Sequence, residues 1–264
     1  MTNFNGKQIY VETHGEGTPL VILNGIMMST PSWKQFIPAL SKYNKLILLD
    51  MLDQGQSSKM SESYDISIQA DVLKAVLDDL KIEKAAICGI SYGASVAMNF
   101  AIKYPDYAEK LVLFNCVPYT SPWLRDIGES WKLARSSPEM YYLTTIPVIY
   151  SMDFYNKNPE WLSTRKDFLT KYVFNNEDFL NAMERLTDSA ATHDVRDGLS
   201  KINAKTLVVG GSEDYLTPIS QQKYIQESIS GARLAVMDNC GHAAMYEQPE
   251  VFTALITGFI NGGE

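Results

Sequence analysis

The stretch "AAICGISYGASVAMNFAIKYP", residues 85–105, changes its hydrophobic pattern at Ser91. The residues before this serine form a short continuous apolar run, which is typical of a strand buried on both faces. After the serine, small apolar residues recur at the spacing of a helix. Gly89 and Gly93 flank the serine and permit a tight connection. The sequence therefore predicts a strand, a sharp turn that carries Ser91, and a helix.

Similar apolar runs occur five more times along the chain. They are residues 19–25, 45–50, 110–116, 206–211 and 232–238. Helical spacing separates several of them, for example from Leu73 to Leu80, and a last helix is expected over residues 249–260. This alternation of strands and helices predicts an α/β fold with a mostly parallel central sheet flanked by helices.

The alternation stops after residue 116 and resumes near Lys205. Residues 117–200 contain several prolines, helix-length amphipathic stretches and no strand-like run, and they are rich in aromatic side chains. We expect residues 1–116 and 201–264 to form the α/β core and residues 117–200 to form an inserted helical cap. The aromatic side chains would fill the core of this cap or form an apolar wall that faces a substrate.

Composition and charge exclude several classes of function. The net charge of −8, without a dense cluster of Lys and Arg, argues against nucleic acid as a partner. No apolar run is long enough to span a bilayer, and the first residues do not resemble a signal peptide, so a cytoplasmic location is expected. The spacing of Cys88, Cys116 and Cys240 suggests neither disulfides nor a metal site, and no cofactor is expected.

A serine hydroxyl is a weak nucleophile unless a base takes its proton, so Ser91 needs a histidine nearby. The chain has three histidines. His14 and His193 lie in predicted turns and are interpreted as turn or surface residues. His242 directly follows the last predicted strand, in "NCGHAAMYEQPEVF", where a loop can fold back over the carboxyl edge of the sheet. We therefore predict that His242 is the base.

The base needs a carboxylate that orients it. "TLVVGGSEDYLTP" offers Glu213 and Asp214 just after a buried strand. We favour Asp214, because it begins a turn at the same edge of the sheet as Ser91, whereas Glu213 would point to the opposite side. The other position where such an acid could lie, the end of the strand predicted at residues 110–116, carries Asn115, which cannot hold an imidazolium as a carboxylate can.

With the chain order Ser91, Asp214, His242, the sequence resembles the α/β-hydrolase fold family with a helical cap. The segments "GISYG", "GGSEDYLTP" and "CGHAAMYEQPEVF" match the family's nucleophile, acid and histidine segments, and the likeness extends over nearly the whole chain. The resemblance implies an oxyanion hole made by the backbone N–H groups of Tyr92 and Ile26, with Met27 as an alternative to Ile26. Candidate substrate contacts are Asn24, Met27, Met28 and Trp123.

Two segments depart from the usual family pattern. Asn24-Gly25 replaces a His-Gly pair, and Leu52-Asp53 replaces an Arg-Gly pair. Together with "GSEDYLT", these segments are similar to the bacterial synthases that join two 3-hydroxyacyl units into the lipid precursor of rhamnolipids. Asp53 is interpreted as a residue that caps its own loop, with a substrate contact as the alternative.

Three functions remain open from the sequence. The first is a serine hydrolase that cleaves a small carboxylic ester or thioester through an acyl-enzyme on Ser91. The second is an acyltransferase that passes the acyl group, for example from a 3-hydroxyacyl-type donor, to an alcohol or amine while the cap excludes water. The third is a ligand-binding protein that keeps the fold without turnover.

Overall fold

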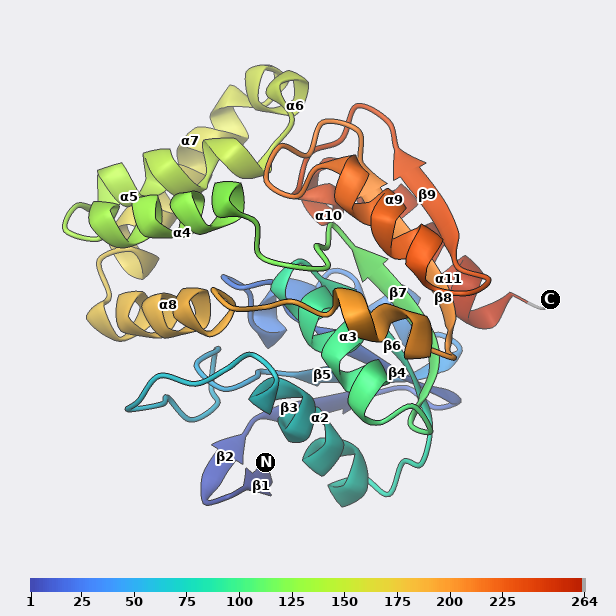
Figure 1. The fold of residues 1–264 in the computed structure, drawn as a ribbon. Coiled ribbons are helices and arrows are strands. Elements are labelled where there is room, and N and C mark those ends of the chain that lie inside the picture. The colour runs from blue at the N-terminus through green and yellow to red at the C-terminus, as the bar shows by residue number, and fades with distance from the viewer. Residues whose placement is uncertain (263–264) are drawn as a thin grey trace.

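The computed structural model describes residues 1–262, and a seven-stranded sheet lies at its centre (Figure 1). The strand order is β3-β5-β4-β6-β7-β8-β9. Their bounds are β3 (Val11–His14), β4 (Thr18–Leu23), β5 (Asn44–Leu49), β6 (Ala85–Ile90), β7 (Ala108–Phe114), β8 (Lys205–Gly211) and β9 (Arg233–Met237). Only β3 runs antiparallel to its neighbour, β5. All six predicted strands and the mostly parallel sheet are confirmed.

The N-terminal strands were not predicted. β1 (Thr2–Phe4) and β2 (Lys7–Ile9) form a separate hairpin, and β3 contains the sequence "VETH". These strands are short and carry polar side chains, because they lie at or beyond the edge of the sheet, where one face is open to water.

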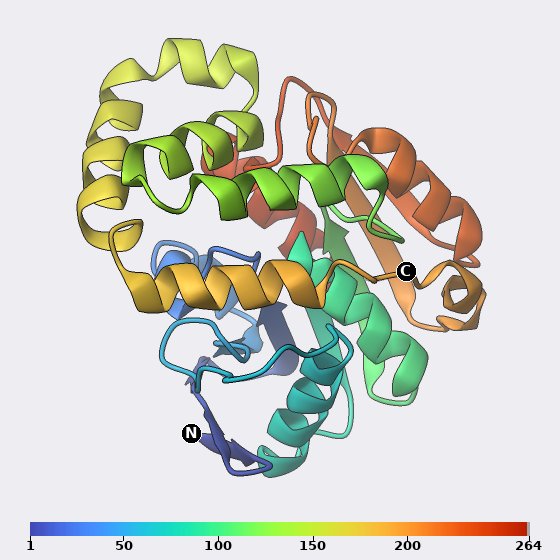
Figure 2. The same ribbon diagram turned by 60° about the vertical axis from the view of Figure 1, so that its left-hand side comes forward.

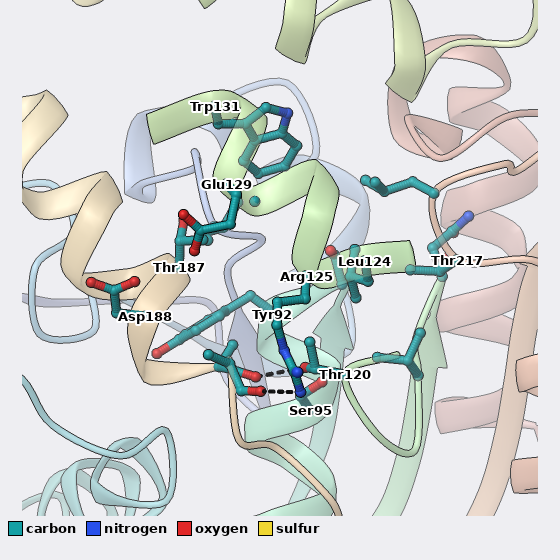
Figure 3. A pocket seen from close by; sticks show the side chains of 18 residues that line it. Tyr92, Ser95, Thr120, Leu124, Arg125, Glu129, Trp131, Thr187, Asp188 and Thr217 are labelled. Atoms are coloured by element: carbon teal, nitrogen blue, oxygen red, sulfur yellow. Dashed lines mark hydrogen bonds between the residues drawn. The ribbon is translucent and has the colours of Figure 1, made fainter. Parts of the chain in front are cut away.

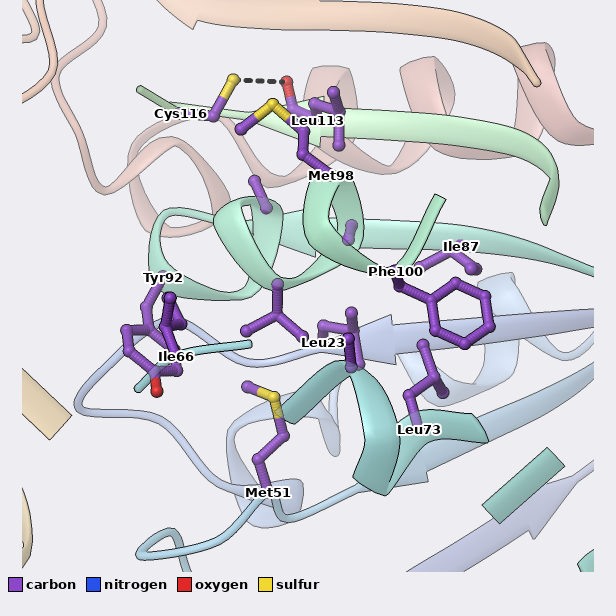
Figure 4. Packing of buried hydrophobic residues seen from close by; sticks show 14 of the residues in the cluster. Leu23, Met51, Ile66, Leu73, Ile87, Tyr92, Met98, Phe100, Leu113 and Cys116 are labelled. Atoms are coloured by element: carbon purple, nitrogen blue, oxygen red, sulfur yellow. Dashed lines mark hydrogen bonds between the residues drawn. The ribbon is translucent and has the colours of Figure 1, made fainter. Parts of the chain in front are cut away.

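Successive side chains along a strand point to opposite faces of the sheet and pack into two hydrophobic cores, one on each face. In β4, Val21 and Leu23 belong to one core, and Leu20 and Ile22 belong to the other. The helices α2 (Ile68–Asp79), α3 (Tyr92–Lys103) and α9 (Ile219–Ser228) cover the first face. The second face is covered by η1 (Thr30–Trp33), α1 (Ile37–Leu40), α10 (Ala244–Glu247) and α11 (Pro249–Asn261). Figure 4 shows the first core, with Phe100 of α3 packed among strand and helix side chains.

The segment between β7 and β8 is helical, as Figures 1 and 2 show. It contains α4 (Pro122–Ala134), α5 (Pro138–Thr145), η2 (Pro147–Ile149), α6 (Met152–Lys157), α7 (Pro159–Phe168), the π-helical turn η3 (Leu169–Val173) and α8 (Glu177–Ser189). Ser121, Ser137, Ser151 and Asn176 each precede one of these helices, and each side chain accepts a backbone N–H of the first turn. These residue types are preferred N-caps, so the sequence itself sets where the helices begin.

The two ends of this helical segment lie side by side. Tyr119 and Asp194 form an antiparallel bridge, and the N–H of Thr120 donates to the carbonyl of His193 at 2.8 Å. The chain then forms η4 (Arg196–Lys201), which packs against α3 and α9. The predicted boundary after residue 200 therefore lies within η4. Among residues 1–262, no helix is both long and apolar enough to cross a membrane.

His193 was expected to be a turn or surface residue, but it is buried where the helical segment rejoins the sheet domain. Its Nε2 lies 3.3 Å from the carbonyl oxygen of Val117, and its Nδ1 lies 3.4 Å from Nδ2 of Asn99. Burial lowers the pKa of His193, and the hydrogen bond to Val117 and two nearby carboxylates only partly oppose this effect. The folded protein therefore favours the neutral imidazole.

This burial predicts a pH dependence of stability. Below a pH of about 6.5, the unfolded chain protonates this histidine while the folded chain resists protonation, so the free energy of unfolding decreases as the pH falls. We expect His193→Gln to reduce this decrease, measured by urea unfolding between neutral and mildly acidic pH. Equal slopes for the parent and the variant would contradict the assignment.

Candidate active site

Ser91 occupies a strained turn at the carboxyl end of β6. Its backbone has φ 54° and ψ −116°, a region that residues other than glycine rarely adopt. Hydrogen bonds hold this conformation: the N–H of Ser91 donates to Phe114 in β7 at 2.9 Å, and its carbonyl accepts from Ala94 and Ser95 in α3. The turn directs the half-buried serine away from the sheet at the first turn of α3.

Two glycines allow α3 to approach the sheet closely at this turn. A Cβ atom on Gly93 would lie 2.2 Å from the carbonyl oxygen of Leu23 in β4. A Cβ atom on Gly89 would lie 2.5 Å from the carbonyl oxygen of Gly93. Both distances are too short for any side chain, so the glycines of "GISYG" are required by packing.

The structure brings Ser91, His242 and Asp214 into one chain of hydrogen bonds. Nε2 of His242 lies 2.9 Å from Oγ of Ser91, and Nδ1 of His242 lies 2.8 Å from Oδ2 of Asp214. His242 lies in the loop between β9 and α10, and Asp214 follows β8. Three segments distant in sequence thus meet at the carboxyl edge of the sheet.

Asp214 is buried and heavily hydrogen-bonded. Its Oδ1 accepts from the N–H groups of Leu216 and Thr217, and its Oδ2 accepts from Oγ1 of Thr217 and Nδ2 of Asn115. Burial alone would raise the pKa of Asp214, but the charge of His242 and these hydrogen bonds outweigh it and lower the pKa. Asp214 is therefore a carboxylate at neutral pH, and it favours the His242 tautomer with a proton on Nδ1.

In this tautomer, Nε2 of His242 is an acceptor directed at the Ser91 hydroxyl. A neutral imidazole in that position can take the serine proton, and the buried carboxylate stabilises the imidazolium that results. The chemistry that this arrangement supports is nucleophilic attack by a serine oxygen.

Asn115 contributes to the site in a way that the sequence analysis missed. Its side-chain amide donates to Asp214 at 2.7 Å and lies 3.3 Å from the carbonyl oxygen of Gly241. The available signal was its position at the end of a buried strand, which places a polar side chain at the same edge as Ser91. Asn115 thereby connects the acid to the loop that carries His242.

Free backbone donors lie beside Ser91. Within residues 1–262, the N–H groups of Tyr92, Ile26 and Met27 donate no hydrogen bond to the protein, whereas the N–H of Met28 closes a turn onto Gly25. The side chain of Tyr92 is buried, and its hydroxyl lies 2.9 Å from Oγ of Ser189. The hydroxyl of Tyr92 is therefore engaged by the protein, whereas its backbone N–H is free.

Two cavities meet at Ser91. The larger has a volume of about 670 Å³, reaches His242, and extends under α7 and α8, where its walls are mainly apolar. The smaller, of about 90 Å³, lies between α4, α8 and the first turn of α3 (Figure 3). The residues that line both are Ile26, Ser91, Asn115, Trp131 and Leu216.

The predicted substrate contacts divide into two groups. Met27 and Met28 line the larger cavity. Asn24 does not line either cavity, contrary to the prediction, because its amide is used in the core: it donates to Leu49 and Gln54 and accepts from the indole of Trp33. Trp123 also lies outside both cavities. Its side chain is 56% exposed, and its indole donates to the carbonyl of Tyr215.

Asp53 joins the sheet domain to the helical segment. Its Oδ1 accepts from the N–H of Met60 at 3.0 Å, as expected for a residue that caps its loop. The same oxygen accepts from Nε and Nη2 of Arg185 in α8, at 3.0 and 2.6 Å. The side chain of Asp53 is fully buried, so this charge pair fixes α8 over the loop. Among residues 1–262, no group of three or more His, Cys, Asp and Glu side chains could hold a metal ion.

Comparisons with known proteins agree with this architecture. A family model described as alpha/beta hydrolase fold matches residues 18–249. The crystal structure of MGS-M2, an alpha/beta hydrolase enzyme from a Medee basin deep-sea metagenome library, is 47% identical, covers 99% of this chain and 97% of that chain, and superimposes with a TM-score of 0.97.

Two more distant relatives also match over nearly their whole length. The 2-hydroxymuconate semialdehyde hydrolase of Pseudomonas sp. (strain CF600) is 27% identical, covering 97% of this chain and 91% of its own. Est816, described as an N-acyl homoserine lactone degrading enzyme, is 27% identical, covers 98% of this chain and 99% of its own, and has a TM-score of 0.82.

The packing of the Ser91 turn predicts an asymmetry between two glycines. Gly93→Ala forces a methyl group against the Leu23 carbonyl and should lower the free energy of unfolding by about 1–3 kcal/mol. Gly258→Ala in α11, where a Cβ would meet nothing within 4 Å, is the matched control and should be neutral or stabilising. Chemical unfolding of both variants checks this, and an unchanged stability of Gly93→Ala would refute the close approach.

Proposed function

Because the chain belongs to the alpha/beta hydrolase fold family, we propose that it hydrolyses a carboxylic ester or thioester through a covalent acyl-enzyme on Ser91. The observation that carries this proposal is the hydrogen-bonded chain from Ser91 through His242 to Asp214. An N-acyl homoserine lactone contains a cyclic ester, so the description of Est816 supports the same class of bond.

The first half of the reaction forms the acyl-enzyme. Nε2 of His242 takes the proton of Ser91 as Oγ bonds to the substrate carbonyl carbon. The carbonyl oxygen becomes an oxyanion, which the free N–H groups of Tyr92 and Ile26 stabilise. Ile26 is preferred to Met27 because it lines both cavities, whereas Met27 lines only the larger one. The imidazolium then gives its proton to the leaving alcohol or thiol, and the bond to the leaving group breaks.

The second half releases the acid. His242 takes a proton from water, whose oxygen attacks the acyl carbon, and the same proton then returns to Oγ of Ser91 as the ester bond to the enzyme breaks. Asp214 stays ionised throughout, in line with its lowered pKa. In this proposal residues 117–200 act as a cap that covers the acyl group. Residues 1–116 and 201–264 form the catalytic core, of which residues 263–264 lie outside the part that the structure describes.

Covalent labelling tests the roles of these three residues. We expect a fluorophosphonate probe to label the parent protein and not Ser91→Ala. Turnover of a p-nitrophenyl ester should fall on the order of 10⁶-fold in Ser91→Ala or His242→Ala, and about 10⁴-fold in Asp214→Asn. His14→Gln, on the edge strand β3, is the control and should retain parent activity. An unlabelled parent protein would favour a ligand-binding protein without turnover.

Acyl transfer is the second candidate, and the size of the larger cavity favours it. A volume of about 670 Å³ beneath the helical segment can hold an acyl chain together with an acceptor. If the resemblance of the sequence to synthases that join 3-hydroxyacyl units extends to function, the acceptor is a hydroxy acid. Transfer requires the cap to exclude water while the acceptor enters.

Product analysis separates the two candidates. We expect a 3-hydroxyacyl thioester to yield the free acid at the same rate with and without a 3-hydroxy acid in the medium, measured by mass spectrometry. A new ester that replaces the free acid when the hydroxy acid is added would establish transfer instead.

A further inference from the structure

Arg165 of α7 lines the same cavity as Ser91 and His242. Two aromatic rings position its guanidinium: the central carbon lies 5.3 Å from the ring centroid of Trp161 and 4.7 Å from that of Tyr246. Tyr246 lies in α10, shortly after His242, so Arg165 connects the helical segment to the segment that carries the candidate base. Stacking of this kind fixes the plane of a guanidinium and leaves its N–H edge free.

The guanidinium has no acceptor in the part of the chain that the structure describes. Its Nε is buried without a hydrogen-bond partner, and no carboxylate among residues 1–262 forms an ion pair with it. Arg185 on the neighbouring helix α8 differs, because both Nε and Nη2 of that residue bond to Asp53. A buried donor without an acceptor costs free energy. The guanidinium of Arg165 therefore lies at the cavity wall with no protein acceptor, where a ligand can supply one.

The other charges at the cavity wall do not neutralise Arg165. Asp53 pairs with Arg185, and the ammonium of Lys59 donates to the carbonyl of Gly55. Asp178, the remaining acid of the wall, lies in the first turn of α8 and makes no ion pair with Arg165. The neighbours of Arg165 along the chain that also line the cavity are Phe168 and Leu169, which offer no acceptor side chain.

We propose that Arg165 binds a carboxylate of the substrate, remote from the bond that Ser91 attacks. The substrate class is then a half-ester or half-thioester of a dicarboxylic acid, or an ester with an acidic leaving group. A planar carboxylate matches the N–H edge of a guanidinium with two parallel hydrogen bonds. It carries one charge, so its desolvation between apolar walls costs less than that of a dianionic phosphate. This inference rests on the proposed ester hydrolysis for its kinetic test.

The kinetic test compares esters that differ only in the remote group. The probes are p-nitrophenyl half-esters of dicarboxylic acids from succinic to suberic acid, each paired with the monocarboxylic ester that carries a methyl group in place of the carboxylate. We expect the parent protein to have the higher kcat/KM for the half-ester in at least one pair. Arg165→Met should lower the ratio of kcat/KM within that pair by about 10-fold to 100-fold. Arg165→Lys keeps the positive charge but cannot form two parallel hydrogen bonds to a carboxylate. It should give a kcat/KM ratio between those of the parent protein and Arg165→Met.

The matched control is Lys166→Met, which removes one positive charge from the adjacent position of α7. The ammonium of Lys166 lies 5.6 Å from the ring centroid of Tyr142, and Lys166 does not line the cavity. This variant should keep the parent ratio. An unchanged ratio in Arg165→Met across the whole series, or an equal loss in Lys166→Met, would overturn the proposal.

A binding measurement keeps this inference separate from the proposed hydrolysis. We expect calorimetry to detect binding of the matching free dicarboxylate to Ser91→Ala, and about 10-fold or greater weakening when Arg165→Met is added. Arg165-dependent binding in a protein that no fluorophosphonate labels would support the carboxylate site and refute the hydrolase. Ester hydrolysis at Ser91 without Arg165-dependent binding or selectivity would support the hydrolase and refute the carboxylate site.

Discussion

The close approach of α3 to the central sheet is the constraint on which the site depends. Gly93 lies against the carbonyl of Leu23 in β4, and Gly89 lies against the first turn of α3. Ser91, between them, must adopt a positive φ, and it is held there by its hydrogen bond to β7. The strain at this single residue is compensated by the packing of two strands and a helix, which is why the serine oxygen has a fixed position.

The sequence predicted those parts of the fold in which burial dictates residue type. Strands covered on both faces are continuous apolar runs, so β4 to β8 could be recognised, whereas the polar edge strand β3 could not. The strand β9 lies at the other edge of the sheet and is only partly buried, and it was recognised because its sequence is still apolar. Asp214 and His242 could be placed because each follows an apolar strand of the parallel part of the sheet, β8 and β9 respectively. His193 is equally polar and near a turn, but its burial depends on how the helical segment returns to α3, which local patterns do not encode.

Other features depend on contacts between distant segments. Asn115 donates a hydrogen bond to Asp214, which is 99 residues away in the sequence. Arg185 donates to Asp53, which is 132 residues away. The side chain of Asn24 is engaged by Leu49, Gln54 and Trp33, and this core hydrogen-bond network explains why it does not face the cavity. The unpaired state of Arg165 is a property of the folded cavity wall. No residue spacing could reveal that a charge lacks a partner.

The antiparallel bridge between Tyr119 and Asp194 has a consequence for the evolution of this chain. Because the helical segment leaves and re-enters the sheet domain at adjacent points, β7 and β8 stay paired whatever the length of chain between them. Insertions, deletions and rearranged helices can therefore accumulate between these points at a small entropic cost. In the proposed hydrolase, this segment can therefore change the walls of the larger cavity while the Ser91 turn between β6 and α3 is kept.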